Sequence, residues 1–483
     1  MNSAPTANSS STTLSRSGQP PGSLGVQCPR GRLLQSVLEL LDANGLPYCI
    51  LHGYMEYPAR VASDVDCIMP AELLPRQFAT LLRANQDRLG AAVIQWIQHE
   101  STAHYFILAT GGAGPRWEFL SVDVSSDYRR NGRVFYPSEE ILASRRLDRG
   151  FWVPAPALEF GYYLVKKVAK GSLSDDHGRR LAQLYHQDPP RCDREIARFW
   201  RGQSVRMVGS AAASGEWGAV QELLPSLRRE LLWPGTVREF WSSGLYWVAD
   251  AVRRFRRWRA PTGVHVVVLG ADGSGKTTLL AALGAALAPA FRRVATRHLA
   301  PSLFRVVCAN PPVMLPHSRP PRSLIGSLAK AAVWLLDYTV GYYAKIRPAL
   351  ARSTLLLFDR YLVDALVDPR RYRYGGPRWL LRLVWTLIPK PDLVILLDAP
   401  VEVLRARKQE VSLDETERQR HAYRQLVQIL PNGHVVDAAQ PLDRVVMAAG
   451  TVVLEFLTSR TARRLEGRHQ ASAAGRTAFT TTS

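Results

Sequence analysis

The chain has 483 residues, with 62 lysines and arginines against 41 aspartates and glutamates, a formal net charge of +21. This length exceeds one ordinary hydrophobic core, so we expect two or three domains. The positive excess favours polyanionic partners, namely nucleotides, nucleic acid or an anionic membrane. Its five cysteines are far apart and form no C-x-x-C pair, so their spacing does not predict a disulfide framework or a zinc site. Such cysteine usage indicates a reducing compartment.

Residues 1–27 are rich in Ser, Thr, Pro and Gly and lack the apolar core of a signal peptide, so we expect a disordered leader. No stretch offers about 18 consecutive uncharged apolar residues for a membrane span. The nearest, 323–346, is interrupted by Lys330 and Asp337. We therefore predict a soluble, cytoplasmic protein.

A mixed α/β domain is predicted over residues 28–200. "RGRLLQSVLELLDANG" has helical spacing, and a second helical pattern is "ALEFGYYLVKKVAKG". The runs "YCILHG", "DVDCIM", "HYFILAT" and "EFLSVDVS" read as strands.

Three acids mark this first domain. Asp64 and Asp66 alternate along one predicted strand, so both carboxylates face the same side, and Asp123 lies on another apolar strand. Converging carboxylates suit Mg²⁺ ions in nucleotide chemistry, although acids at strand ends also serve only solubility. With Gly53 and the Asp-x-Asp spacing, the pattern resembles the nucleotidyltransferase superfamily of DNA polymerase β. The resemblance implies a nucleotidyltransferase-like fold with Asp64, Asp66 and Asp123 as metal ligands.

Residues 201–261 read as a helical basic linker. The segment 236–259 places apolar residues on one helical face and crowds five arginines at its end. Two interpretations stay open: a connector packed against one domain, which we favour, and an amphipathic helix lying on an anionic membrane.

A second α/β pattern covers residues 262–458. Its predicted strands are "VHVVVLG", "RRVATRHL", "TLLLFDR", "DLVILLD" and "HVVDA", separated by helical patterns at 276–288, 322–348, 378–388, 400–428 and 440–457. Near-continuously apolar strands alternating with helices predict a five-stranded parallel sheet covered by helices on both faces. The remaining residues, 459–483, read as a disordered basic tail.

The stretch "GADGSGKTT" fits the G-x-x-x-x-G-K-[ST] phosphate-binding loop, between a predicted strand and a helix. Its backbone N–H groups and the helix N-terminus favour the phosphates of ATP. We expect Lys276 to reach the β- and γ-phosphates and Thr277 to ligate Mg²⁺. The predicted ATP-binding residues are Gly270, Ala271, Asp272, Gly273, Ser274, Gly275, Lys276, Thr277 and Thr278.

Asp359 and Arg360 follow a buried strand at the edge where α/β sheets bind their ligands. An acid there holds Mg²⁺ or receives a proton, and a guanidinium grips a second phosphate. "GADGSGKTT", "DRY" (359–361) and "PDLVILLDAPVEVLRARKQE" together resemble thymidylate kinase and related nucleoside monophosphate kinases. The resemblance implies a P-loop kinase that uses ATP and Mg²⁺, with Lys276, Asp359 and Arg360 catalytic, Asp359 also near the metal, and Arg405 or Arg407 as a lid arginine.

The segments that touch the acceptor nucleotide in that family read differently here, as "LVDALVDPRRYR" and "TRHLAPS". Three hypotheses follow: a nucleoside monophosphate kinase, a P-loop kinase acting on a phosphorylated sugar or other metabolite, and a membrane-associated ATP-binding regulatory protein. We expect nucleotides as partners and no specific nucleic acid. A homodimer and peripheral membrane attachment stay open.

Overall fold

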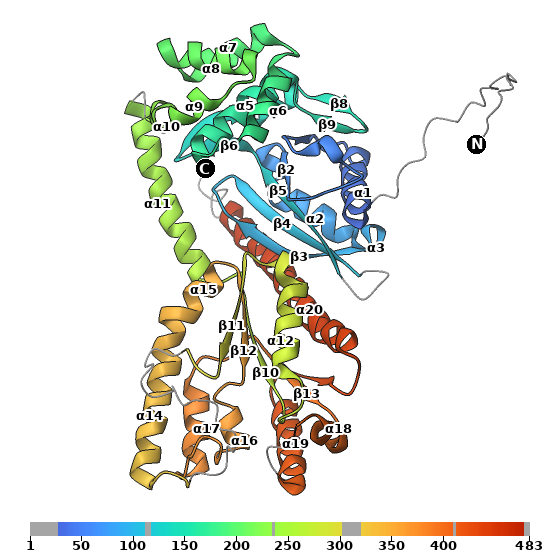
Figure 1. The fold of residues 1–483 in the computed structure, drawn as a ribbon, viewed down its shortest axis with the longest axis vertical. Helices are drawn as coiled ribbons and strands as arrows, with labels where there is room; N and C mark the ends of the chain where they lie inside the picture. The colour runs from blue at the N-terminus through green and yellow to red at the C-terminus, as the bar shows by residue number, and fades with distance from the viewer. Residues whose placement is uncertain (1–27, 112–116, 234–236, 302–319, 409–411, 478–483) are drawn as a thin grey trace, which may run out of the picture.

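The computed structural model describes residues 28–111, 117–233, 237–301, 320–408 and 412–477, and the predicted leader lies outside this range. Two α/β units are stacked along the long axis of the molecule (Figure 1). A long helix, α11 (Val237–Arg259), connects them along one side, and the last helix, α20 (Leu442–Thr477), runs back from the C-terminal unit to the N-terminal sheet.

A mixed five-stranded sheet forms the N-terminal unit, in the order β1-β2-β5-β4-β3. Its strands are β1 (Cys49–Ile50), β2 (Val65–Ile68), β3 (Ala91–Gln98), β4 (Ala103–Thr110) and β5 (Glu118–Ser125). β2 and β5 are parallel, and the other neighbours are antiparallel. The mixed α/β prediction is confirmed, but β3 was not predicted, because a short apolar run does not by itself distinguish a strand from a buried helix.

Helices and two small hairpins surround this sheet. They are α1 (Pro29–Ala43), η1 (Tyr54–Glu56), η2 (Ala71–Leu73), α2 (Arg76–Ala84), α3 (Gln86–Leu89), the hairpin of β6 (Asp127–Arg130) and β7 (Arg133–Pro137), α4 (Ser138–Ala143), the hairpin of β8 (Arg146–Asp148) and β9 (Phe151–Val153), α5 (Pro156–Lys170), α6 (Asp175–Tyr185), α7 (Pro189–Phe199), α8 (Gly202–Ser214), α9 (Gly218–Glu222) and α10 (Leu224–Leu232).

The N-terminal unit extends beyond the predicted boundary at residue 200. Val208 of α8 and Leu227 and Leu231 of α10 are buried in the same hydrophobic cluster as Leu164 of α5. Burial of these apolar residues ties α8 to α10 to the N-terminal unit. Only α11 therefore has the connecting position that we expected for the whole of 201–261.

The C-terminal sheet is five-stranded and wholly parallel, in the order β11-β12-β10-β13-β14, which confirms the predicted fold class. Its strands are β10 (Val264–Leu269), β11 (Arg293–His298), β12 (Thr354–Asp359), β13 (Leu393–Asp398) and β14 (Gly433–Asp437). The covering helices are α12 (Lys276–Leu287), η3 (Ala288–Ala290), α14 (Leu324–Gly341), η4 (Tyr342–Ile346), α15 (Arg347–Ala351), α16 (Asp364–Val367), α17 (Arg378–Leu387), α18 (Val401–Arg407), α19 (Leu413–Gln428) and α20.

Strand alternation explains why this sheet is covered on both faces. Val266 and Val268 of β10 belong to the cluster that includes α12 and α20, while Val267 and Leu269 belong to the cluster that includes α14, α17 and α19. Because successive side chains point to opposite faces, a strand buried on both sides must be apolar at every position.

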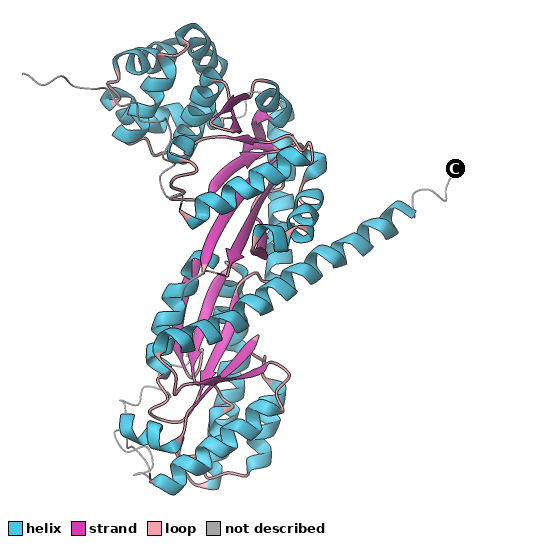
Figure 2. Cartoon of the chain, turned by 90° about the vertical axis from the view of Figure 1, so that its right-hand side faces the viewer, coloured by secondary structure: helices cyan, strands magenta, loops and turns pink. Residues whose placement is uncertain are grey.

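The two units share one hydrophobic cluster. Ile107 and Phe119 of the N-terminal sheet pack with residues of α12, β10 and α20. Gln95 Nε2 donates to the carbonyl oxygen of Ala290 at 2.9 Å, and Thr461 Oγ1 donates to that of Ile94 at 2.8 Å. The two sheets follow one another along the molecule, with α20 crossing both (Figure 2).

The disordered tail predicted from residue 459 differs from the structure. α20 continues without interruption from Leu442 to Thr477. Thr461 and Leu465 are buried, the latter in the N-terminal core, so contact with the other unit holds a segment whose composition alone suggested a tail.

Two helical stretches, Leu324–Ala351 and Leu442–Glu466, are long and apolar enough to cross a membrane by length and composition. In its most apolar 18-residue window, the first stretch is 33% buried inside the protein and the second is 44% buried. Both stretches cover the C-terminal sheet. Core helices of other proteins have the same length and composition, so these two stretches are not assigned as membrane spans.

Candidate active site

The predicted phosphate-binding loop joins β10 to α12 at the carboxyl edge of the sheet. Gly273 has a φ of 84°, and a Cβ there would lie 2.4 Å from the carbonyl oxygen of Leu404 in α18. A Cβ on Gly270 would lie 2.6 Å from Ser274 Oγ. Any side chain at either position would push the loop open, which is why glycine is needed at both.

Lys276 begins α12 and is buried under the loop. Its Nζ donates to the carbonyl oxygens of Gly270 at 2.8 Å and Ala271 at 3.0 Å. Burial, and next the charge of Arg360, lower the pKa of the Lys276 ammonium to about 8. A poorly solvated cation beneath a loop of N–H groups is suited to the oxygens of a polyphosphate.

Two buried polar atoms beside the loop lack a hydrogen-bond partner, Ser274 Oγ and Asp359 Oδ1. Thr277 and Thr278 are exposed in the first turn of α12. Asp359 ends β12 and pairs in register with Val268 of β10. An unpartnered carboxylate oxygen and an exposed threonine hydroxyl are both oxygen ligands of the kind that Mg²⁺ takes in nucleotide sites. The residues present therefore fit MgATP, with Thr277 and Asp359 on the metal side.

Arg360 is almost fully buried, with a φ of 69°, and is held by two carboxylates. Its Nη2 donates to Asp272 at 2.6 Å and its Nη1 to Asp364 at 2.9 Å. Arg371 also donates to Asp272. The guanidinium that we predicted to grip the acceptor's phosphate thus links the phosphate-binding loop to α16.

Asp364 is the centre of this network and has no exposed surface. Tyr372 donates to it at 2.6 Å, and Tyr423 of α19 donates to its other oxygen. Burial opposes the charge of Asp364, but Arg360 and the two tyrosine hydroxyls outweigh it and lower the pKa of this carboxyl. The network fixes Arg360 in one position.

The two predicted lid arginines lie at the end of α18, which packs on the loop through Leu404. Arg407 Nη1 donates to the carbonyl oxygen of Ala438, beyond β14, at 2.9 Å. Of the pair, Arg405 directly follows the residue that contacts Gly273.

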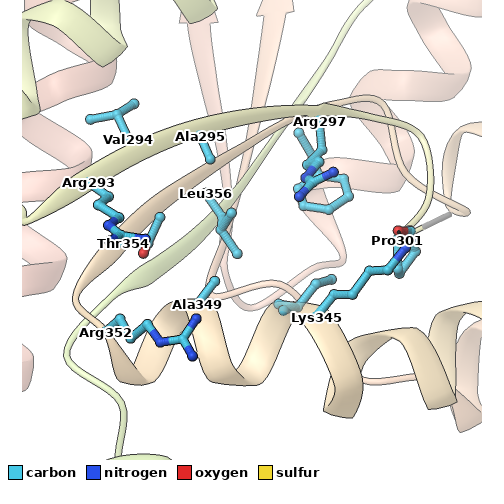
Figure 3. Close-up of a pocket in the computed structure, with 12 residues that line it drawn as sticks. Arg293, Val294, Ala295, Arg297, Pro301, Lys345, Ala349, Arg352, Thr354 and Leu356 are labelled. Atoms are coloured by element: carbon cyan, nitrogen blue, oxygen red, sulfur yellow. Dashed lines mark hydrogen bonds between the residues drawn. The ribbon is translucent and has the colours of Figure 1, made fainter. Parts of the chain in front are cut away.

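A small basic cavity of about 170 Å³ lies between β11, β12 and the helical stretch of η4 and α15 (Figure 3). Arg297 lines it and pairs in register with Phe358, one residue before Asp359. Because side chains alternate, Arg297 shares the face of Phe358 rather than that of Asp359. This cavity is smaller than a nucleotide site and stands apart from the loop.

The three acids of the N-terminal unit are placed less symmetrically than predicted. Asp66 and Asp123 pair in register on the neighbouring parallel strands β2 and β5, whereas Asp64 is exposed and precedes β2. Lys166 of α5 is buried and bonds Asp66 at 2.9 Å, and His52 lies 3.0 Å from the same carboxylate.

The electrostatics of these acids follow from their neighbours. Burial works against the charge of Asp66, but His52 and Lys166 lower its pKa. Burial and the adjacent Asp66 raise the pKa of Asp123 to about 8. Across the described residues, no group of three or more His, Cys, Asp or Glu side chains is placed to hold a metal ion. If these acids bound a metal ion, Asp66 would have to release Lys166 and bind the metal ion in its place.

Sequence reasoning named Arg371 among the candidate arginines for the acceptor's phosphate but did not identify Asp364 and Tyr423 as site residues. Asp364 stands four residues after Arg360, but Arg360 has a φ of 69° and lies before α16, so helical spacing does not predict the pair. Tyr423 lies 59 residues from Asp364, and no local pattern connects them.

Comparison with known proteins agrees with this geometry. The model of the thymidylate kinase family matches residues 324–448, which include Asp359, Arg360, Arg405 and Arg407. The thymidylate kinase of Xanthomonas campestris pv. campestris is 30% identical over 215 residues, covering 41% of this chain and 87% of that protein. The thymidylate kinase of Xanthomonas oryzae pv. oryzae is 30% identical over 217 residues, with the same coverage. The probable thymidylate kinase of Pyrococcus horikoshii is 28% identical over 195 residues, 38% of this chain and 92% of the relative.

Proposed function

Because the chain belongs to the thymidylate kinase family through its C-terminal unit, we propose that this unit transfers the γ-phosphoryl group of ATP to a nucleoside monophosphate. The observation that carries the proposal is the loop at 270–278, with Lys276 buried beneath it and Asp359 facing it with an unpaired oxygen. Such transfer needs positioning and neutralisation of phosphate charge rather than a covalent enzyme intermediate.

Each residue of this site has a separate task in the proposal. The loop N–H groups and Lys276 hold the phosphates, Thr277 and Asp359 hold Mg²⁺, and Arg405 neutralises charge that develops during transfer. Mg²⁺, when bound, supplies charge neutralisation between the phosphates. Arg360, through its bonds to Asp272 and Asp364, orients the acceptor side of the loop.

The identity of the acceptor is the finer part of the proposal. Thymidylate is suggested by the names of the relatives. The segment after Arg360 holds Asp364, Arg371 and Tyr372, whose side chains point into the protein. Tyr372 donates to Asp364, and Arg371 donates to Asp272 of the loop. A phosphorylated sugar or other metabolite is the alternative acceptor, because these inward-facing residues replace the family's acceptor contacts.

The test is ADP release from MgATP across dTMP, dUMP, UMP, CMP, AMP and GMP, with sugar monophosphates as a second panel. We expect one nucleoside monophosphate to raise ADP release at least ~100-fold above the ATP-only rate, because a bound acceptor completes the reacting geometry. Turnover with a sugar phosphate alone would show that the acceptor is a phosphorylated sugar and not a nucleoside monophosphate. ATP binding without turnover on any acceptor would contradict kinase activity.

We also propose that α11 attaches the protein to an anionic membrane. The side of α11 that faces the protein carries Tyr246, Asp250 and Arg253, whereas the solvent side carries Leu245, Val248 and Phe255, which are 61–70% exposed. This is the reverse of a helix packed on a soluble protein. Arg254 and Arg256 border the apolar side, an arrangement complementary to anionic headgroups above an apolar interior.

Vesicle co-sedimentation tests this attachment. We expect binding to phosphatidylcholine–phosphatidylglycerol vesicles at low salt, little binding to phosphatidylcholine alone, and at least ~10-fold weaker binding after Leu245→Ser with Phe255→Ser, since each lost apolar side chain removes burial energy. Ile429→Ser, at an exposed residue after α19, is the control. If the double variant instead converts a homodimer to a monomer and vesicles never bind, the face is a dimer interface and the membrane proposal fails.

A further inference from the structure

A second cleft lies between the two units, away from the phosphate-binding loop. It measures about 770 Å³ and is bounded by the end of β3, by α11, and by the chain entering β10. Thr262, which lines it, precedes β10, whereas the phosphate-binding loop follows that strand. Six strand residues at about 3.3 Å each separate the two places by roughly 20 Å. The cleft is therefore a different site from the one described above.

Five arginines line this cleft, and the described residues around it supply no acidic side chain to its lining. They are Arg253, Arg256, Arg257 and Arg259 of α11 and Arg464 of α20. Trp96 and Ile97 of β3 and Val252 of α11 add an apolar wall. A concave site of this volume, with apolar walls and several converging cations, has the character of a small-molecule site.

The positive charge of the cleft is only partly compensated. Arg253 and Arg254 both pair with Asp250. Arg257 Nε is buried without a hydrogen-bond partner. Burial, and then the charges of Arg292 and Arg253, lower the pKa of Arg257. A guanidinium held among other guanidinium groups with an unused buried donor is unfavourable by itself and becomes favourable when an anion enters.

We propose that this cleft binds a soluble ligand with two or more phosphate groups and a body of nucleotide size. Arginine forks match phosphate oxygens in pairs, and the wall of Trp96, Ile97 and Val252 accommodates the apolar or aromatic part. The inference does not depend on the proposed kinase activity.

Titration of inorganic tripolyphosphate by calorimetry tests the proposal on full-length protein. Lys276→Met is the starting variant, because it disables the phosphate-binding loop and leaves the cleft as the binding site. Adding Arg257→Gln is expected to raise the tripolyphosphate Kd at least ~10-fold through loss of one charged fork. The matched control is Arg254→Gln, from the same helix, whose side chain is 72% exposed and does not line the cleft; its Kd is expected to change less than ~2-fold.

A second measurement separates ligand binding from folding. Without ligand, Arg257→Gln is expected to leave the Tm unchanged or higher, because it removes an uncompensated buried charge. The proposal is overturned if Lys276→Met binds no tripolyphosphate, or if the two arginine variants weaken tripolyphosphate binding equally. It is also overturned if the protein binds phosphate groups only when these are presented on anionic vesicles.

Discussion

We expect that replacing Lys276 with methionine lowers kcat/KM for phosphoryl transfer by at least ~1000-fold while the protein stays folded. The lysine is the buried cation beneath the loop, and its Nζ now bonds to the carbonyl oxygens of Gly270 and Ala271. A cation in this position neutralises phosphate charge most strongly in the transition state, so its loss affects kcat as well as ATP binding. The measurement is steady-state ADP release with the acceptor that the panel identifies.

The same substitution has an opposite effect on stability. Burial and Arg360 lower the pKa of Lys276 from 10.5 to about 8, which corresponds to roughly 3 kcal/mol of unfavourable free energy at neutral pH. Between pH 8 and 10.5 the unfolded chain binds more protons than the folded one, so the wild-type protein gains stability as pH rises. We therefore expect Lys276→Met to be at least as stable as wild type at pH 7, with its advantage shrinking towards pH 10.5.

A matched control and a contradicting result are available for this prediction. Lys170→Met removes an exposed lysine at the end of α5 and should leave turnover unchanged. Wild-type turnover in Lys276→Met would show that the loop does not hold the reacting phosphates. Loss of turnover accompanied by lower stability at every pH would point to damage of the fold instead.

Replacing Arg360 with methionine is expected to cost about 3–5 kcal/mol of unfolding free energy and at least ~100-fold in kcat/KM. The buried guanidinium compensates Asp364, which has no exposed surface, and also bonds to Asp272 in the loop. Removing one partner leaves a buried charge uncompensated, which is more costly than the pair was worth. Chemical denaturation and steady-state turnover measure the two effects.

A double variant separates the stability role of Arg360 from its role at the site. Arg360→Met with Asp364→Asn removes both charges and should recover much of the lost stability, since no unpaired ion remains. Turnover should stay low, because Asp272, although still bonded to Arg371, then loses its link through Arg360 to α16. Arg370→Met, at an exposed arginine of the same segment, is the control. Recovery of turnover together with stability would restrict Arg360 to a structural role.

The sequence by itself determined the features that depend on neighbours along the chain. The glycines, Lys276 and Thr277 stand at fixed spacings in one loop. Short apolar runs located all five strands of the C-terminal unit, and alternation of these runs with helical patterns located its main helices. These are local relations, since backbone geometry alone converts spacing into structure.

Only the tertiary structure decided which distant groups meet. Arg360, the predicted phosphate ligand, bonds to Asp272, 88 residues away. Lys166 bonds to Asp66, 100 residues away. Packing likewise held α20 in place beyond residue 458 and turned the charged side of α11 towards the protein. A buried charge requires a partner wherever the fold brings one, and sequence spacing carries no information on which residue that is.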